Sequence, residues 1–322
     1  SVSGYHIREA GSTAAQELAF TLNNGFAYIE ECLERGLKID DFAHRLSFFF
    51  NAHMDFFEEI AKYRAARRIW ANRLKDKYGA KNESSLKLKF HSQTAGCSLT
   101  AQQPENNIVR TAFEAMSAVL GGTNSLHTNS LDETLALPSE KAAKIALRTQ
   151  QILAFETGVP NVADPLGGSW YIEELTDKLE KQAIKYFEEI QEMGGTVQAI
   201  EDGYFQKKIA ESASIYQESV DSKERIIVGV NDFIEEDEEL DIEILKISRD
   251  AQDTQENKIK TLRKSRDEKK LQEKMKKLSD ACKKDLNLVP FLIEVAEQGG
   301  TVGEIVEVMK KVYGEWEESF GI

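Results

Sequence analysis

The 322-residue chain has few cysteines, no long apolar run and no excess of basic residues. Its three cysteines, Cys32, Cys97 and Cys282, are an odd number without metal-ligand spacing, which argues against a disulfide framework and a structural metal site. No apolar run approaches the roughly 20 residues of a membrane span. The formal net charge of -14 argues against nucleic acid or an anionic membrane surface as a partner. We therefore expect a cytoplasmic globular protein with reduced thiols.

The chain also lacks the motifs of several common enzyme classes. It has no phosphate-binding loop, no dinucleotide fingerprint, no nucleophile beside a base and no closely spaced pair of carboxylates. Its first residues carry no secretion signal and read as the middle of a domain. We therefore expect a fragment or one half of a split protein.

The first 160 residues repeat a strand and a helix four times. Apolar patterns predict strands at 2–7, 46–51, 86–90 and 125–129. Helical spacing predicts the helices that follow them, at 14–35, 55–78, 104–120 and 139–157. Alternating units imply a parallel sheet, and their spacing fits a (β/α)8 barrel of the TIM type. Four units are half of such a barrel, which leaves an inner face that another chain or another copy must cover.

The pattern changes after the fourth helix. We divide the chain into 1–160, the half-barrel, and 161–322, a mostly helical extension. In the extension, a densely charged stretch at 253–284 predicts one long, solvated helix. Two shorter helices, at 288–297 and 302–313, carry apolar stripes that we expect to pack on the half-barrel.

Polar residues gather at the ends of the predicted strands. In a β/α barrel these positions converge on one mouth, where ligands bind. Lone histidines are usually structural, but three strand ends carry a histidine or a run of amides and hydroxyls. This favours a site that donates hydrogen bonds to a carbonyl oxygen as it gains charge. The residues are Tyr5, His6 and Glu9, then His91 and Gln93, then His127 and Asn129.

Isolated charged residues complete the candidates. Glu9 and Glu133 each stand alone and suit the binding of hydroxyl groups better than acid–base catalysis. Arg45 and Ser47 flank the start of the second predicted strand. The planar guanidinium of Arg45 can bind a phosphate, although no phosphate motif surrounds it.

Several long stretches of the chain resemble one enzyme family. They include SGYHIREAG, HRLSFFFNAHMDFF, FHSQTAGCSLTAQQPENNIVRTAF, SLHTNSLDETLALP and VADPLGGSWYIEEL. These stretches resemble the large, catalytic subunit of the methylmalonyl-CoA mutase family, the adenosylcobalamin-dependent acyl-CoA mutases. The resemblance extends over nearly the whole chain. It implies the C-terminal half of the substrate-binding barrel, followed by a helical linker.

The resemblance also implies a reaction, the radical isomerisation of the carbon skeleton of an acyl-CoA. Methylmalonyl-CoA, interconverted with succinyl-CoA, is the first substrate that we expect. Cys97 stands where mutases of methylmalonyl-CoA often have Trp. Isobutyryl-CoA, 2-hydroxyisobutyryl-CoA and ethylmalonyl-CoA therefore stay open as substrates.

The family's motifs carry roles onto particular residues of this chain. His6 would donate a hydrogen bond to the thioester carbonyl, and its neighbour Tyr5 would pack near the adenosyl group of the cofactor. Glu9 and Glu133 would face the ribose or corrin side of the cofactor, and Gly96 would line the cavity there.

The same resemblance implies how the chain holds its substrate. Arg45 and Ser47 would contact the coenzyme A tail. His91 and Gln93 would line the cavity around the acyl group.

Two parts of the family's enzymes are not found in this sequence. The cobalamin-binding signature Asp-x-His-x-x-Gly is absent, so the histidine that ligates cobalt must come from another chain, a cobalamin-binding small subunit. The N-terminal half of the barrel is also absent, so we expect an oligomer that is inactive without these partners. The alternative is an inactive structural or assembly fragment that oligomerises through its open edges.

Overall fold

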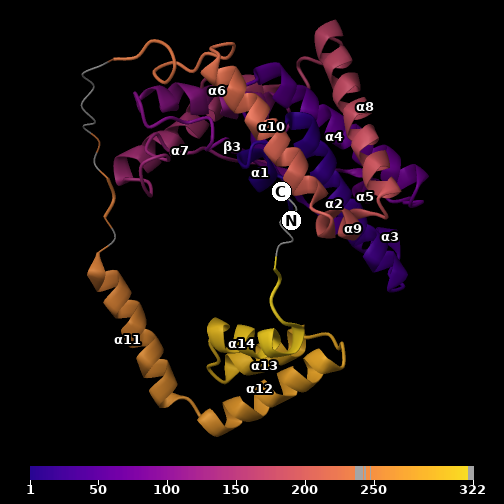
Figure 1. The fold of residues 1–322 in the computed structure, drawn as a ribbon, viewed down its shortest axis with the longest axis vertical. Coiled ribbons are helices and arrows are strands. Elements are labelled where there is room, and N and C mark those ends of the chain that lie inside the picture. The colour runs from indigo at the N-terminus through magenta and orange to yellow at the C-terminus, as the bar shows by residue number, and fades with distance from the viewer. Residues whose placement is uncertain (236–241, 243, 247, 318–322) are drawn as a thin grey trace. The chain divides into compact units, whose positions relative to one another are not determined.

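The computed structural model describes residues 1–235, 242, 244–246 and 248–317 (Figure 1). Within them the chain forms two compact units, whose main bodies are Ser1–Leu245 and Lys246–Glu318. None of the described helices is both long and apolar enough to cross a membrane.

A four-stranded parallel sheet lies at the centre of the first unit. Its strands are β1 (Val2–Ser3), β2 (Phe48–Ala52), β3 (Phe90–Thr94) and β4 (Ser125–His127). They pair in chain order, β1-β2-β3-β4. The register aligns Ser3, Phe49, His91 and Ser125 in one row across the sheet. The predicted parallel sheet is therefore confirmed.

Helices connect the strands and continue beyond β4. In the first unit they are α1 (Tyr5–Glu9), α2 (Ala14–Glu34), α3 (Ile39–Phe42), η1 (Ala43–Arg45), α4 (Phe56–Asp76), α5 (Glu83–Leu86), α6 (Asn106–Leu120), α7 (Glu140–Phe155), η2 (Val159–Asn161), α8 (Trp170–Glu192), α9 (Thr196–Glu201) and α10 (Tyr204–Asp221). Side-chain caps fix several starts. Thr13 and Gln16 form a capping box before α2, and Ser139 caps α7, where its start was predicted.

The two faces of the sheet have different surroundings. On one face, Phe48, Phe50 and Phe90 are buried in a core shared with α2 and α4. Trp70 of α4, for example, meets the ring of Phe48 edge to face, with centroids 5.0 Å apart. On the other face, Phe49, His91 and Gln93 are only half-buried, whereas Asn51, farther along β2, is buried. We call this second face the open face; its residues include Phe49, His91 and Gln93.

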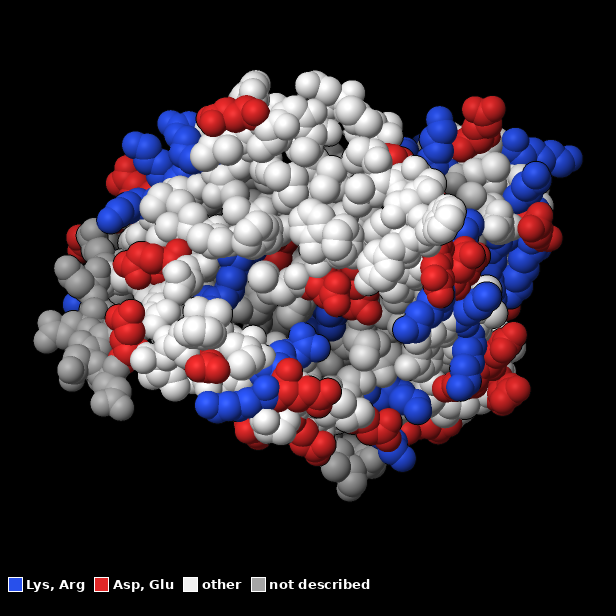
Figure 2. Space-filling view, turned by 90° about the horizontal axis from the view of Figure 1, so that it is seen from above, with Lys and Arg blue, Asp and Glu red and all other residues white. Residues whose placement is uncertain are grey.

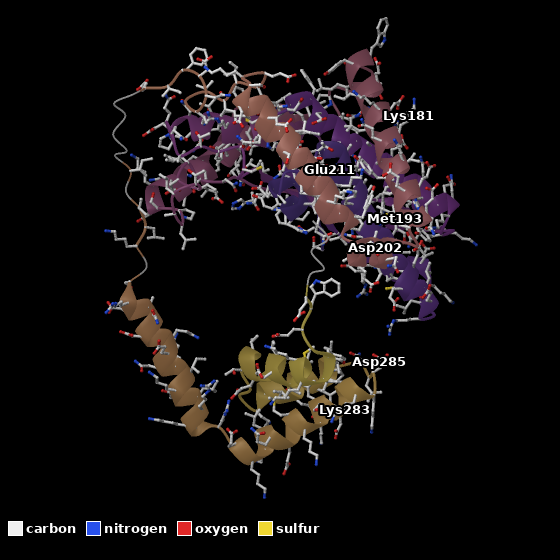
Figure 3. All side chains as sticks on the ribbon, in the orientation of Figure 1. Lys181, Met193, Asp202, Glu211, Lys283 and Asp285 are labelled. Atoms are coloured by element: carbon white, nitrogen blue, oxygen red, sulfur yellow. The ribbon has the colours of Figure 1, made fainter. Side chains whose placement is uncertain are left out.

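Helix α8 belongs to the same core. Leu179, Ala183 and Phe187 are buried in it, and the rings of Phe26 and Phe187 lie 5.6 Å apart, edge to face. The predicted division of the chain at residue 160 thus falls inside the first unit. Lys181 lies on the exposed side of α8 and points outward (Figure 3).

Two predicted strands are placed wrongly. The strand predicted at 2–7 ends at Ser3, and α1 follows. Beyond this point the backbone of Asn51 in β2 is bound by the side chains of Glu17, Lys62 and Tyr63. The strand predicted at 86–90 is replaced by Phe90–Thr94. The polar residues from His91 onward were predicted as a loop, but they alternate between the core and the open face.

The second unit has a core of its own. Its helices are α11 (Arg249–Ser265), α12 (Glu268–Lys283), α13 (Val289–Glu297) and α14 (Val302–Tyr313). The single helix predicted at 253–284 is wrong, because extended backbone at Arg266 ends α11 and Asp267 caps α12. The apolar stripes of α13 and α14 pack against α12, and their packing on the half-barrel stays a prediction.

Charged side chains of both signs mix on the surface. On the face that Figure 2 shows, Lys and Arg side chains alternate with Asp and Glu side chains around broad uncharged areas. The acidic excess therefore forms no continuous patch on this face.

Candidate functional site

Side chains from a strand and from two connections meet at the carboxyl end of the sheet. The Gln93 Nε2 group of β3 donates hydrogen bonds to Tyr5 Oη of α1 and to Asn129 Oδ1 beyond β4, each at 2.9 Å. Tyr5 and Asn129 lie 88 and 36 positions from Gln93 in the chain. The structure thus brings Tyr5 and Gln93 together, as expected from the strand ends.

Glu9 ties this group to the loop after β3. Its carboxylate accepts hydrogen bonds from the backbone N–H groups of Gly96 and Cys97, both at 2.9 Å, and from Asn51 Nδ2 at 2.6 Å. A Cβ atom on Gly96 would lie 3.1 Å from Glu9 Oε2 and 3.6 Å from Tyr5 Oη. The glycine therefore lets the loop approach both side chains closely.

Burial and negative charge set the ionisation of this group. Burial, and next the Glu9 carboxylate, raise the pKa of Tyr5 well above its usual value. Partial burial, and next Glu9, also raise the pKa of Glu133. Tyr5 therefore keeps its proton at neutral pH, and both carboxyl groups lie within electrostatic range of each other. The site offers a hydroxyl donor beside oxygen acceptors.

A row of rings extends from this group across the open face. The ring of Tyr5 stacks on Phe49 with centroids 5.0 Å apart, and Phe49 meets His91 edge to face at 5.0 Å. His91 Nδ1 lies 2.7 Å from Ser125 Oγ. Burial, and next His127, lower the pKa of His91, so its imidazole is neutral at pH 7. The open face is therefore an uncharged, partly aromatic surface.

His6 lies beside this row. It is exposed, and its Nδ1 atom is 3.3 Å from Ser3 Oγ. Because Nδ1 faces the protein, Nε2 is available to a ligand over the open face.

Arg45 and Ser47 lie at the opposite end of the sheet. They precede β2, whereas the group around Tyr5 follows the carboxyl ends of the strands. The five residue-to-residue steps from Ser47 to Ala52 separate the two ends by roughly 17 Å. The structure thus separates the two candidates from the Tyr5 group, and only a long ligand could contact both.

Buried charges that the sequence patterns did not predict lie behind the site. Lys62 Nζ lies 2.6 Å from Glu17 Oε2 and also contacts Glu59, and all three side chains are fully buried. It donates to the backbone oxygen of Asn51 at 2.8 Å. Two features of the sequence could have indicated this cluster. Asn51 directly follows three phenylalanines, and Lys62 lies among apolar residues of a predicted helix.

A cavity of about 480 Å³ adjoins Glu9. Its walls include Arg8, His53, Glu58 and Cys97. Burial, and next Arg8, lower the pKa of His53 well below its usual value. The cavity is within the size range of small-molecule sites and adds polar room beside the Tyr5 group.

Comparison with known proteins identifies the family. The sequence model of methylmalonyl-CoA mutase matches residues 1–315. The chain belongs to the methylmalonyl-CoA mutase family. It is 46% identical over 319 residues to the 2-hydroxyisobutanoyl-CoA mutase large subunit of Aquincola tertiaricarbonis. It is 48% identical over 318 residues to methylmalonyl-CoA mutase of Rhizobium meliloti and 46% identical over 317 residues to the mitochondrial enzyme of Homo sapiens.

The matches are unequal in length. They cover 98 to 99% of this chain, but 57%, 44% and 42% of the three relatives. The chain thus spans about half the length of the curated relatives it matches. These relatives are named as mutases, and mutases are isomerases.

The family implies adenosylcobalamin, and part of the site fits it. Carboxylates at Glu9 and Glu133 can accept hydrogen bonds from ribose hydroxyls, and Gly96 lets the loop after β3 lie close against Glu9. Among the described residues, no group of three or more His, Cys, Asp and Glu side chains could hold a metal ion. The fit therefore concerns the organic side of the cofactor.

Proposed function

We propose that this chain forms the C-terminal half of the substrate-binding (β/α)8 barrel of an acyl-CoA mutase. Four parallel strands in chain order, with the core on one face only, support this proposal. A sheet of this kind continues into a barrel when four further units complete it. We propose that residues 1–160 supply the half-barrel, that 161–322 supply the helical extension, and that the other half comes from sequence outside this chain.

The reaction that fits best is the isomerisation of the carbon skeleton of an acyl-CoA. The observation that carries it is the meeting of Tyr5, Glu9 and Gln93 at the carboxyl end of the open face. In the proposed mechanism His6 donates from Nε2 to the thioester oxygen, which stabilises charge there. Gln93, held by Tyr5 and Asn129, fixes the acyl group.

The two ends of the open face would hold the two ends of the substrate. Arg45 and Ser47, at the amino end, would bind the coenzyme A tail, and His91 would line the path between. A charge-assisted contact from Arg45 to a phosphate is the strongest interaction available there. The half-buried rings between the ends would keep water from the reacting acyl group.

Adenosylcobalamin, when bound, supplies the radical that starts the rearrangement. Glu9, Gly96 and Glu133 would face its ribose or corrin side, and Tyr5 would pack near its adenosyl group. The cobalt ligand would come from a cobalamin-binding small subunit, so the active form would be an oligomer of different chains.

The choice of acyl-CoA is the finer part of the proposal. Methylmalonyl-CoA, converted to and from succinyl-CoA, is the first candidate, and 2-hydroxyisobutyryl-CoA the second, because relatives of both names match the chain. Isobutyryl-CoA and ethylmalonyl-CoA follow. Cys97, exposed beside Glu9, is a small side chain at the rim of the site.

Reconstitution tests this function. The chain would be combined with the other barrel half, a cobalamin-binding small subunit and adenosylcobalamin, and the isomerisation of each acyl-CoA measured. We expect His6→Ala to lower kcat by at least about tenfold. His44→Ala, at the amino end of the sheet, is the matched control and should leave kcat unchanged. A His6→Ala enzyme within about threefold of the parent would contradict the assigned role.

The open face also favours a second candidate, an assembly module without activity. Half-buried rings such as Phe49 are usual at protein interfaces. Size in solution and a spectral titration with adenosylcobalamin separate the two. A chain that oligomerises by itself and binds neither cofactor nor acyl-CoA would favour the module.

A further inference from the structure

Asn51 lies in β2, just beyond the part of this strand that pairs with β1. Side chains, instead of a neighbouring strand, bind its backbone. Its N–H donates to Glu17 Oε1 at 2.7 Å, and its carbonyl oxygen accepts from Lys62 Nζ at 2.8 Å and Tyr63 Oη at 2.6 Å. Both backbone groups of Asn51 are thus satisfied by buried side chains of α2 and α4.

These side chains are themselves held firmly. Lys62 lies between the carboxylates of Glu17 and Glu59, and all three are fully buried. Burial raises the pKa of Glu17, and Lys62 opposes that rise. Moving any member would leave a buried charge without its partner, which costs several kcal/mol. Asn51 is therefore fixed at both backbone groups.

The side chain of Asn51 points the other way, to the site. Its Nδ2 group donates to Glu9 Oε1 at 2.6 Å. The residue is fully buried, and its Oδ1 atom finds no hydrogen-bond partner among the described residues. Among the described residues, Glu9 is therefore the hydrogen-bond partner of this side-chain amide. Glu9 in turn holds the backbone N–H groups of Gly96 and Cys97.

We propose that Asn51 is a positioning residue. Its hydrogen bonds link the rigid Lys62 cluster to the Glu9 carboxylate, and this carboxylate fixes the loop at Gly96. The importance of this loop for cofactor binding rests on the proposed function. The positioning itself rests on the hydrogen bonds alone. A series of buried contacts thus runs from the core of the covered face to the rim of the open face.

Amide hydrogen exchange of Gly96 and Cys97 tests the positioning in this chain alone. Asn51→Leu removes the donor to Glu9 and keeps the side chain similar in size. We expect both amides to exchange about fivefold faster or more, the factor that corresponds to the ~1 kcal/mol of one hydrogen bond. Asn23→Leu is the matched control, since Asn23 is buried but binds Thr196. It should leave both amides unchanged.

A second variant and a double-mutant cycle keep the test decisive. Asn51→Ala replaces Asn51→Leu if the latter does not fold. In a Glu9→Ala background, either change at Asn51 should have no further effect on exchange, because the carboxylate through which it acts is gone. Unchanged exchange in the single variant, or an equal acceleration in both backgrounds, would overturn the proposal.

Titration of adenosylcobalamin into the assembled enzyme separates this inference from the proposed function. We expect Asn51→Leu to weaken cofactor affinity about fivefold, the same ~1 kcal/mol, with the KM for acyl-CoA unchanged. Faster exchange with unchanged cofactor affinity would support the positioning and contradict the cofactor role of Glu9. A changed KM with unchanged exchange would contradict the positioning.

Discussion

The two faces of one sheet use the same residue types for different purposes. Phe50 is fully buried among Phe48, Tyr63 and Phe90, whereas its neighbour Phe49 is half-buried between Tyr5 and His91. The covered face excludes water and stabilises the fold. The open face keeps rings and imidazoles accessible at some cost in burial, which is the expected arrangement of a surface that binds a ligand or a partner.

The largest expected effect lies on the covered face. Lys62→Met leaves Glu17 and Glu59 without their cation, so we expect the free energy of unfolding to fall by about 3–5 kcal/mol. Urea unfolding measures it. Lys77→Met is the control, because Lys77 pairs with Glu30 at the surface and should cost under ~1 kcal/mol. Equal losses would mean that the buried cluster does not stabilise this face.

Phe50 and Phe49 provide the direct comparison of the faces. Phe50→Ala removes a fully buried ring, so we expect a loss of about 3–4 kcal/mol. Phe49→Ala should cost only about 1 kcal/mol, because folding buries that ring only in part. Urea unfolding of both variants checks it. Similar losses for the two would show that the open face is also part of the core.

Glu114, a fully buried residue of α6, extends the comparison to a change of pH. Burial raises the pKa of Glu114 well above its usual value, so the folded state holds its proton longer than the unfolded state does. The wild-type chain should therefore lose stability as pH rises above the unfolded pKa. Glu114→Gln removes this loss. We expect the free energy of unfolding of the variant, relative to that of the wild-type chain, to rise by roughly 1 kcal/mol or more between pH 5 and pH 8. Urea unfolding measures this difference. A difference that does not change with pH would contradict the claim that the folded state keeps Glu114 protonated.

Sequence patterns could reach some of these features and not others. The parallel sheet, the helix starts at Thr13 and Ser139, and the meeting of Tyr5 with Gln93 follow from periodicity, caps and strand order. The two faces could not be told apart in β2, because Phe48, Phe49 and Phe50 are one residue type. Local patterns miss such differences, since long-range packing decides them.

The same limit explains the misplaced elements. The end of β1 at Ser3 depends on Lys62 and Tyr63, which are far away in the chain. The fully buried Lys62 contradicts the usual exposure of lysine, and only its partners Glu17 and Glu59 make it possible. The break at Arg266 follows from its two hydrogen bonds to Glu304, another distant residue.

The smallest expected effect on stability lies on the open face. Tyr5→Phe removes the hydroxyl that accepts from Gln93 but keeps the stacked ring, so we expect a loss under ~1 kcal/mol. In the assembled enzyme the same variant should raise the activation free energy, calculated from kcat, by more than it lowers the free energy of unfolding. The reason is that it frees Gln93 at the proposed acyl site. Thermal unfolding and steady-state kinetics measure the two effects. A loss of stability without a change in kcat would assign Tyr5 to the core.

Histidine modification tests the central claim, that the open face holds the acyl-CoA. Diethyl pyrocarbonate would be applied to the assembled enzyme with and without acyl-CoA, and the rate at each histidine followed by mass spectrometry. We predict that acyl-CoA slows modification of His6, His91 and His127 severalfold. The rate at His53, which lines the cavity beside Glu9 and not the open face, should stay unchanged. Unchanged rates at all three open-face histidines, at saturating acyl-CoA, would contradict the claim.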